Sequence, residues 1–423
     1  RSGGRLIFWN KRKPLFIIRK RDVGVFHISL ICTFTDITFT TTIMEIFYFV
    51  FAAFLLSIGA GWVIIPRIVM ISKKKRLFDE LSARKSHTGM VPRLGGASFF
   101  PTFLFAFTLT MGMRYILGFE VADDYFMDSL CELMFLQAGS TVLFCVGMAD
   151  DLTGVGYKGK FLAQTLSAVL ICCSGVGITS LDGLFGIYEI PYWLGVILTI
   201  LIIVLLANAY NLIDGIDGLC SGLSLLALLT FGIWFIIHGI YVYAMMAMAM
   251  GGVVLVFFFY NVLGKRLKVF MGDTGSLLLG YMIAFLGLKF YSLNVSGEFF
   301  RINAAPAVFL GVVSIPVFDV VRVFCARMAA GLSPFYPDRR HIHHKLLRIG
   351  LTHLQSAMVI VLLQVGFILL NFLLRNVSIN LLLAINILLG FMINYLLNLL
   401  GGRYVAPQVQ QNVPEHVEEN SDK

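Results

Sequence analysis

Five short polar runs carry the groups in this sequence that could perform chemistry. In the run ANAYNLIDGIDGL, Asn208, Asn211 and Asp214 are three residues apart, so a helix would align them along one face, and Asp217 follows. Carboxylate and amide oxygens are the ligands that Mg²⁺ takes in proteins. The run lacks the D-x-D-x-D-G spacing and the distal glutamate of a calcium-binding hand. It therefore favours a magnesium site near a helix end.

Two further runs place carboxylates beside cations or backbone N–H groups. Asp150 and Asp151 are adjacent at the end of an apolar segment, and Lys160 follows in the next short loop. Neighbouring carboxylates repel each other unless a metal, a lysine or a shared proton compensates. In FMGDTGS, which begins at Phe270, Asp273 precedes the expected start of a helix, where exposed N–H groups suit an anion. Its carboxylate would suit a metal that faces a diphosphate.

The fourth run is basic and rich in glycine. Lys85 and His87 precede PRLGG, which contains Arg93 and the pair Gly95-Gly96. The cations suit a phosphate, and the glycine pair lets the backbone approach a ligand closely. An ordinary basic loop beside a membrane remains an alternative for this run.

The fifth run, DRRHIHHK, contains two arginines and three histidines. Three histidines within four residues could bind a transition metal, but no cysteine or further histidine completes a zinc set. Arginines beside histidines fit diphosphate binding or acid–base chemistry better. A solvated basic loop also remains open. The residues concerned are Arg339, Arg340, His341, His343 and His344.

The composition predicts the elements that must position these runs. The 423 residues are 58% hydrophobic and only 13% charged, and the mean hydropathy is +0.85. Soluble domains have about 25% charged residues, so a soluble or disordered chain is excluded and a polytopic all-α membrane protein is predicted. A span needs about 20 apolar residues, and about eleven such segments occur. They lie near 45–66, 96–117, 130–149, 161–178, 190–210, 219–238, 241–263, 275–292, 304–326, 354–374 and 378–400.

The basic residues predict the orientation of these spans. If the first loop is cytoplasmic, all but four of the lysines and arginines after Met44 lie on the inner side. The amino end is then outside and the carboxyl end inside, and all five polar runs lie on the cytoplasmic face. The net charge of +9 is therefore explained by basic residues that set the orientation of the chain in the membrane, and no nucleic-acid partner is expected.

Three regions are expected along the chain. Residues 1–43 form a basic extension without a function, which is non-native or disordered, because Met44 reads as a natural start. Residues 44–400 form the polytopic domain, and 401–423 form a polar, disordered cytoplasmic tail. The seven cysteines indicate neither a disulfide framework nor a zinc site.

Oxygen ligands and cations at a membrane surface indicate a Mg²⁺-bound diphosphate as one substrate. The position at the membrane indicates a lipid as the other. Phosphoryl transfer needs mainly positioning and charge neutralisation, which these residue types supply.

Together, the five ordered runs resemble those of the polyprenyl-phosphate N-acetylhexosamine-1-phosphate transferases over about residues 44–400. The resemblance is to the bacterial undecaprenyl-phosphate GlcNAc-1-phosphate transferase branch of glycosyltransferase family 4, which is related to phospho-MurNAc-pentapeptide translocase. It implies eleven spans in the bacterial inner membrane and a Mg²⁺ ion, or alternatively Mn²⁺, at a cytoplasmic active site. The implied reaction joins UDP-GlcNAc to polyprenyl phosphate, releases UMP and initiates a cell-surface polysaccharide such as the O antigen of lipopolysaccharide. Another UDP-N-acetylhexosamine, UDP-MurNAc-pentapeptide as donor, and a homodimer are left open.

The resemblance also implies roles for individual residues. Asp273 and Asn211 would hold the metal, while Asp150 or Asp151 would act on the lipid phosphate, one of them as its base. Lys160 would bind phosphate. Phe270 would stack on the uracil, and Asp217 would contact the nucleoside. Arg339 and Arg340 would hold the diphosphate or sugar together with the three histidines. The catalytic set is thus Asp150, Asp151, Asp214, His341, His343 and His344, and the further substrate-binding residues are Lys85, His87, Arg93 and Asn208.

Two questions of mechanism and class remain. The lipid phosphate is already ionised near neutral pH, which favours its direct attack on the β-phosphorus over a covalent carboxylate intermediate. A secondary transporter is the rival class, but it predicts inverted repeats and polar residues near the membrane midplane. The sequence has no such repeat, and its polar residues lie at one face.

Overall fold

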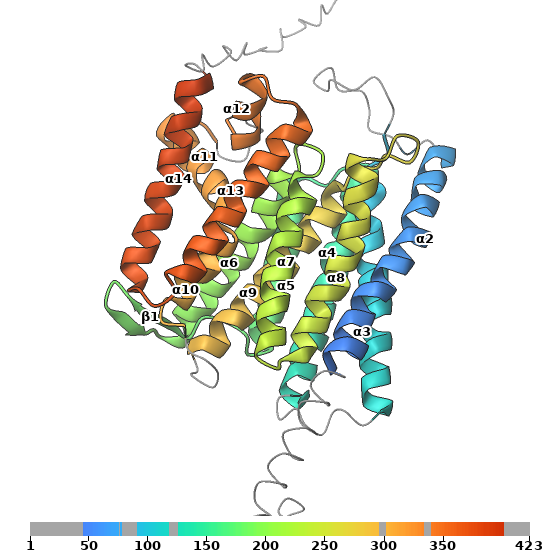
Figure 1. Cartoon of the computed structure of the whole chain (residues 1–423), viewed down its shortest axis with the longest axis horizontal. Coiled ribbons are helices and arrows are strands. Elements are labelled where there is room, and N and C mark those ends of the chain that lie inside the picture. The colour runs from blue at the N-terminus through green and yellow to red at the C-terminus, as the bar shows by residue number, and fades with distance from the viewer. Residues whose placement is uncertain are drawn as a thin grey trace, which may run out of the picture. The chain divides into compact units, whose positions relative to one another are not determined.

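Apolar helices make up nearly all of the described chain (Figure 1). The computed structural model describes residues 45–75, 77, 91–117, 126–295, 302–333 and 340–401. The extension predicted at 1–43 and the tail predicted after 401 lie outside these ranges. The helices are η1 (Glu45–Val50), α2 (Phe51–Lys75), η2 (Leu94–Ser98), α3 (Phe99–Ile116), α4 (Phe126–Thr153), α5 (Tyr157–Cys173), α6 (Tyr192–Ile213), α7 (Leu219–Ile237), α8 (Tyr241–Val262), α9 (Gly272–Val295), α10 (Ala305–Val312), α11 (Ser314–Ala329), α12 (Ile342–Arg348), α13 (His353–Leu373) and α14 (Ile379–Gly401).

The predicted polytopic, helical membrane fold is confirmed. Within the described residues, nine helices are long and apolar enough to cross a membrane, and the bent pair α10–α11 makes a tenth candidate. The helix α5 falls at the remaining predicted position, but it is only 17 residues long. The count of eleven therefore stays a prediction.

The helix α9 is the most enclosed of the spans. Its side chains are buried on nearly all sides, as expected for a helix that is apolar all round, and it packs against α4, α6, α7 and α10. By contrast, α14 exposes large apolar side chains along much of its length, which suits contact with lipid. The first residues of α9, from Gly272 on, are therefore fixed by helices on several sides.

The predicted ninth span is broken rather than continuous. The helices α10 and α11 meet at an angle of 82°, and Pro316 lies in the first turn of α11. Proline has no N–H and cannot bond to the carbonyl four residues before it. The side chain of Gln364 on α13 satisfies the freed groups, because it donates to the carbonyls of Gly311 and Val312 at 2.9 Å each and accepts the N–H of Ile315 at 3.1 Å.

A small hairpin interrupts the otherwise all-α chain. The strands β1 (Ser180–Leu184) and β2 (Ile187–Glu189) are antiparallel. The turn between them is tethered to α14, because the N–H of Phe185 donates to Oδ1 of Asn380 at 2.8 Å. In the sequence this stretch lies between the predicted spans 161–178 and 190–210, and the hairpin was not predicted. Strands of five and three residues carry little periodic signal.

Candidate active site

Three carboxylates and one lysine meet where α4 ends and α5 and α9 begin. The carboxylate oxygens of Asp150, Asp151 and Asp273 lie within 4.8 Å of one another. Lys160 Nζ lies 2.8 Å from Asp150 Oδ2 and 2.5 Å from Asp273 Oδ2. A lysine thus compensates the repulsion between these carboxylates, which was one of the three possibilities that the sequence left open.

The carboxylate of Asp151 caps the first turn of α9. Its Oδ1 accepts the N–H of Asp273 at 2.8 Å, and its Oδ2 accepts the N–H of Thr274 at 3.0 Å and the hydroxyl of Thr274 at 2.5 Å. The first N–H groups of a helix have no partner within the helix and favour negative charge. The anion site expected at this helix start is therefore occupied by one of the protein's own carboxylates.

The PRLGG segment packs directly on the turn that precedes α9. The N–H groups of Gly95 and Gly96 donate to the carbonyls of Phe270 and Met271 at 2.9 and 2.8 Å. A Cβ atom added to Gly96 would lie 2.3 Å from the backbone N of Gly275. The glycine pair thus lets the PRLGG segment lie directly against the backbone of the turn before α9.

Gly272, the first residue of α9, is equally constrained. Its φ is +73°, a conformation that glycine adopts without strain. A Cβ atom there would lie 2.3 Å from the carbonyl oxygen of Arg93 and 2.5 Å from Oδ2 of Asp151. Only glycine therefore lets Asp151 reach the helix start.

The asparagines of the ANAYNLIDGIDGL run lie on one face of α6, as predicted, but have different partners. Asn208 donates to Oε1 of Gln164 at 2.6 Å. Asn211 donates to the hydroxyl of Ser276 at 2.9 Å, which places it beside the first turn of α9. Of the two amides, Asn211 is the one that contacts the helix carrying Asp273.

The carboxylates after α6 lie in the electrostatic field of the same cluster. Burial raises the pKa of Asp214 well above its usual value, and repulsion from Asp273, Asp151 and Asp217 adds to the effect, while Arg93 opposes it. Asp214 itself is half-buried at the carboxyl end of α6.

Asp217 and Phe270 are linked through a lysine. Lys268 Nζ lies 2.7 Å from Asp217 Oδ2 and 5.8 Å from the centre of the Phe270 ring, within the range of a cation–π contact. Both residues with a predicted role at the nucleoside are therefore brought together beside the turn that leads into α9.

The histidine run is anchored by a buried aspartate. Asp319 on α11 accepts from the backbone N–H of Ile342 at 3.1 Å, and its Oδ2 lies 2.9 Å from His341 Nδ1. Arg322, one turn further along α11, donates to the same carboxylate at 2.7 Å. The link between Asp319 and His341 was not predicted, although a lone aspartate in an apolar helix is a recognisable signal.

His343 faces the loop between α6 and α7. A Cβ atom on Gly215 would lie 2.5 Å from His343 Nε2, and the His343 and His344 ring centres are 4.2 Å apart. Burial lowers the pKa of His343 to about 3, and the neighbouring His344 and His341 contribute. The ring is therefore neutral near pH 7, and its Nδ1 has no partner among the described atoms.

The donor chemistry of the aspartate cluster fits a hard divalent cation. Magnesium takes oxygen ligands, and three carboxylates offer them within a short distance. Within the described residues, these aspartates are the one group of three or more such side chains close enough to share an ion. The alternative of a transition metal held by the three histidines therefore has no support in this part of the chain.

The remaining predicted site residues are only partly covered. Lys85, His87 and Arg339 lie outside the described residues. Arg340 lies at the start of the histidine segment, where its carbonyl accepts from Arg322 at 2.6 Å. Thr274, which bonds to Asp151, was not singled out in the sequence.

The structure is thus a polytopic helical bundle that gathers acidic and basic side chains where α4 ends and α5 and α9 begin. Residues 133–291 match the model of the glycosyl transferase family 4. The undecaprenyl-phosphate alpha-N-acetylglucosaminyl 1-phosphate transferase of Escherichia coli K12 is 32% identical over 300 residues, which are 69% of this chain and 75% of that protein.

Two further relatives agree. The enzyme of the same name from Yersinia pestis is 31% identical over 77% of this chain and 81% of its own length. The probable undecaprenyl-phosphate N-acetylglucosaminyl 1-phosphate transferase of Bacillus subtilis is 33% identical over 75% of this chain and 82% of its own. The chain belongs to glycosyl transferase family 4 and is a phosphoglycosyl transferase, which decides against the rival reading as a transporter.

Proposed function

We propose that this enzyme transfers N-acetylglucosamine 1-phosphate from UDP-GlcNAc to a polyprenyl phosphate, releases UMP and initiates a cell-surface polysaccharide such as an O antigen. The observation that carries this proposal is the meeting of Asp150, Asp151 and Asp273 with Lys160 at one end of the bundle. The names of the bacterial relatives support the sugar and the lipid.

Magnesium is the proposed cofactor, and Asp273 and Asn211 are its proposed ligands. Both side chains lie at the first turn of α9, since Asn211 is bonded to Ser276. When bound, the ion supplies positive charge to the diphosphate of the donor. Lys160 already lies between two carboxylates and is positioned to add a further positive charge at the phosphates.

The two adjacent aspartates have different proposed roles. Both oxygens of Asp151 are engaged by the start of α9, so this residue holds Asp273 in position. Asp150 accepts the N–H of Val155 at 2.7 Å through Oδ1 and faces Lys160 through Oδ2. We assign Asp150 to the side at which the lipid phosphate enters, where it orients that phosphate or acts as its base.

The reaction is proposed to proceed by direct attack. An oxygen of the lipid phosphate forms a bond to the β-phosphorus of the donor, the bond from that phosphorus to the bridging oxygen breaks, and UMP leaves with the bonding electrons. The lipid phosphate is an ionised nucleophile at neutral pH, so catalysis consists mainly of positioning and charge neutralisation.

The other groups are proposed to bind the donor. Phe270 offers its ring to the uracil, Asp217 contacts the nucleoside, and Arg93 lies close enough to Asp214 to act on it electrostatically. The histidine segment reaches the loop between α6 and α7 through His343. The proposed donor and phosphate contacts are completed by the described histidines, by Arg340 and Asn208, and by Lys85, His87 and Arg339. Asp214 remains a proposed catalytic residue.

The proposed setting is the bacterial inner membrane, with the site on the cytoplasmic face, the amino end outside and the carboxyl end inside. The distribution of basic residues supports this orientation. In this setting, the active site faces the compartment that contains nucleotide sugars.

The test is the formation of a radiolabelled glycolipid from UDP-GlcNAc and polyprenyl phosphate by the purified protein, with and without Mg²⁺. We expect a lipid product that depends on the ion. Asp273→Asn should abolish turnover while the protein stays folded, and Glu189→Gln, at an exposed carboxylate of β2, should leave it unchanged. The absence of a lipid product with every UDP-N-acetylhexosamine would overturn the proposal, and near-native activity of Asp273→Asn would refute its metal role.

A further inference from the structure

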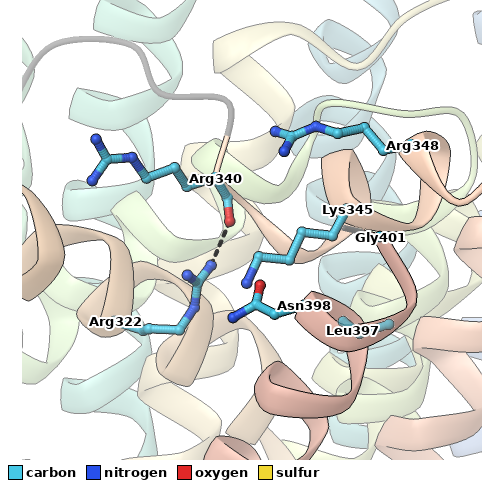
Figure 2. Close-up of a pocket in the computed structure, with 7 residues that line it drawn as sticks. All are labelled: Arg322, Arg340, Lys345, Arg348, Leu397, Asn398 and Gly401. Carbon is cyan, nitrogen blue, oxygen red and sulfur yellow. Dashed lines mark hydrogen bonds between the residues drawn. The ribbon is translucent and has the colours of Figure 1, made fainter. Parts of the chain in front are cut away.

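Two charged side chains of α11 hold the segment that leads into α12. Asp319, whose side chain is 2% exposed, accepts the backbone N–H of Ile342 through Oδ1 at 3.1 Å. Its Oδ2 lies 2.9 Å from Nδ1 of His341. Arg322 donates to Oδ1 of Asp319 at 2.7 Å and to the carbonyl oxygen of Arg340 at 2.6 Å, and Figure 2 shows the second of these bonds. Three consecutive residues, 340–342, are therefore each bonded to α11.

Asp319 caps the start of α12 from outside that helix. His341 is the residue that precedes α12, and its side chain makes no capping bond. The first N–H groups of a helix have no partner within the helix and favour negative charge. The N–H of Ile342, the first residue of α12, has such an acceptor in Asp319. Asp319 therefore determines where the helix that carries His343 and His344 begins.

The same carboxylate selects one form of the His341 ring. An ionised carboxylate only accepts hydrogen bonds, and the ion pair with Arg322 favours the ionised form of Asp319. The proton in the contact between Asp319 and His341 therefore belongs to Nδ1 of the ring. In a neutral imidazole this leaves Nε2 with its lone pair, because the two nitrogens share a single proton.

The orientation of this ring is connected to the loop that follows α6. The rings of His341 and His343 are nearly parallel, with an angle of 6° between their planes and 5.8 Å between their centres. Nε2 of His343 lies 2.5 Å from the position of a Cβ atom on Gly215. Asp214 and Asp217 flank Gly215 in the sequence. A series of contacts thus runs from α11 through two histidines to the loop that carries both carboxylates.

We propose that Asp319 is a positioning residue for the transfer reaction. It fixes His341 in the form that carries its proton on Nδ1, and it directs Nε2 of that ring toward the phosphates or the sugar of the donor. Asp319 itself does not contact the donor. The proposal rests on the proposed function, in which His341 binds the donor. Without the carboxylate, the ring can rotate and place its proton on the other nitrogen.

The first test is a double-mutant cycle on the rate of glycolipid formation by the purified full chain. Asp319→Asn keeps the size of the side chain and removes its charge. We expect the rate to fall about 10- to 100-fold, as is typical when a carboxylate that orients a functional histidine is lost. In a chain that already carries His341→Ala, Asp319→Asn should cause no further fall, because Asp319 acts through that ring. A native rate in Asp319→Asn would overturn the proposal, as would losses that multiply in the double variant.

Glu132→Gln is the matched control for a purely structural effect. Glu132 is also a buried carboxylate in an ion pair, since its Oε1 lies 2.7 Å from Nζ of Lys289. It lies near the start of α4, whereas the aspartate cluster lies at the end of that helix. Glu132→Gln should lower the midpoint of thermal unfolding but leave the rate of the folded protein unchanged. An equal loss of rate in both variants would overturn the proposal, because any buried ion pair would then have the same effect.

The second test measures the proton on the ring directly and needs no Asp319 variant. Nitrogen-15 NMR of the histidine-labelled native chain is recorded at about pH 8, where free imidazole is neutral, and His341→Ala identifies the signals of His341. We expect a protonated Nδ1, and an unprotonated Nδ1 would overturn the proposal. This measurement still decides the question if Asp319→Asn does not fold. It requires no turnover, so its failure is distinct from failure of the proposed function.

Discussion

The carboxylate of Asp151 accepts the backbone N–H of Asp273 at 2.8 Å, so one member of the aspartate cluster is the helix cap of another. The negative charge of Asp151 is stabilised by the amino end of α9, and the position of Asp273 depends on that cap. The geometry and the electrostatics of the candidate site are thus set by the same contact.

Thr274→Val tests this cap with little change in side-chain shape. The hydroxyl that donates to Asp151 at 2.5 Å is lost, and the carboxylate keeps only its backbone donors. We expect a loss of about 1–2 kcal/mol in the free energy of unfolding and a lower turnover rate. Thr153→Val is the matched control, because the Thr153 hydroxyl is exposed and donates within its own helix. Equal effects of the two variants on stability would contradict the role of the cap.

Lys160→Gln tests charge compensation in the cluster. The variant removes the ammonium that lies between Asp150 and Asp273, so the carboxylates repel each other and the phosphates lose a cation. We expect the rate of glycolipid formation to fall by about 100-fold or more. Lys158→Gln changes an exposed lysine two residues earlier and should retain the native rate. A native rate in Lys160→Gln would show that the lysine has no part in the reaction.

Gly96→Ala tests the packing of PRLGG on the start of α9. The added Cβ would meet backbone atoms of Gly275 at 2.3 Å, and backbone cannot turn aside as a side chain can. We expect a loss of about 1–3 kcal/mol or more in stability, seen as a lower midpoint of thermal unfolding. Gly112→Ala in α3 has no atom within 4 Å of the new Cβ and should be neutral or stabilising by up to about 1 kcal/mol. An unchanged midpoint of thermal unfolding in Gly96→Ala would contradict the tight packing of PRLGG on the start of α9.

His343 predicts a dependence of stability on pH. Its pKa falls from 6.5 to about 3 on burial, so between these values the unfolded chain binds a proton that the folded chain does not. The stabilisation from this group is present above about pH 6.5 and is lost as the pH falls toward 3, by at most about 1.4 kcal/mol per pH unit.

The comparison of His343→Gln with the native protein isolates this contribution. Thermal unfolding is measured from about pH 7 down to about pH 5. The native protein should lose stability relative to the variant as the pH falls, because the variant has no proton to gain at this position. A difference that does not change with pH would show that the pKa of His343 is the same in the folded and unfolded states.

Much of the fold follows from the sequence, because a membrane restricts the lengths that an apolar segment can have. The predicted span 219–238 corresponds to α7 at Leu219–Ile237, and 378–400 corresponds to α14 at Ile379–Gly401. The break between α10 and α11 was not predicted, since the kink is stabilised by Gln364 from a different helix. Such a partner cannot be identified from local sequence.

The candidate site, like the fold, was predictable in part: its residues were, and their arrangement was not. Residue type singled out Asp150, Asp151, Lys160 and Asp273, and the family resemblance implied their roles at the phosphates and the metal. The structure brings these four side chains together. Their mutual arrangement could not be predicted. That Asp151 turns toward the backbone of α9 depends on the packing of α4 against α9, which only the three-dimensional structure shows.

The contact between Lys160 and Asp273 joins residues 113 positions apart in the sequence. During synthesis, α4 and α5 enter the membrane long before α9 is made, and until then Lys160 has only Asp150 as a described acidic partner. Insertion of α9 therefore adds Asp273 to the acidic cluster and gives Asp151 the helix start that it caps. A chain that ends before α9 therefore lacks Asp273 and the helix start that Asp151 caps.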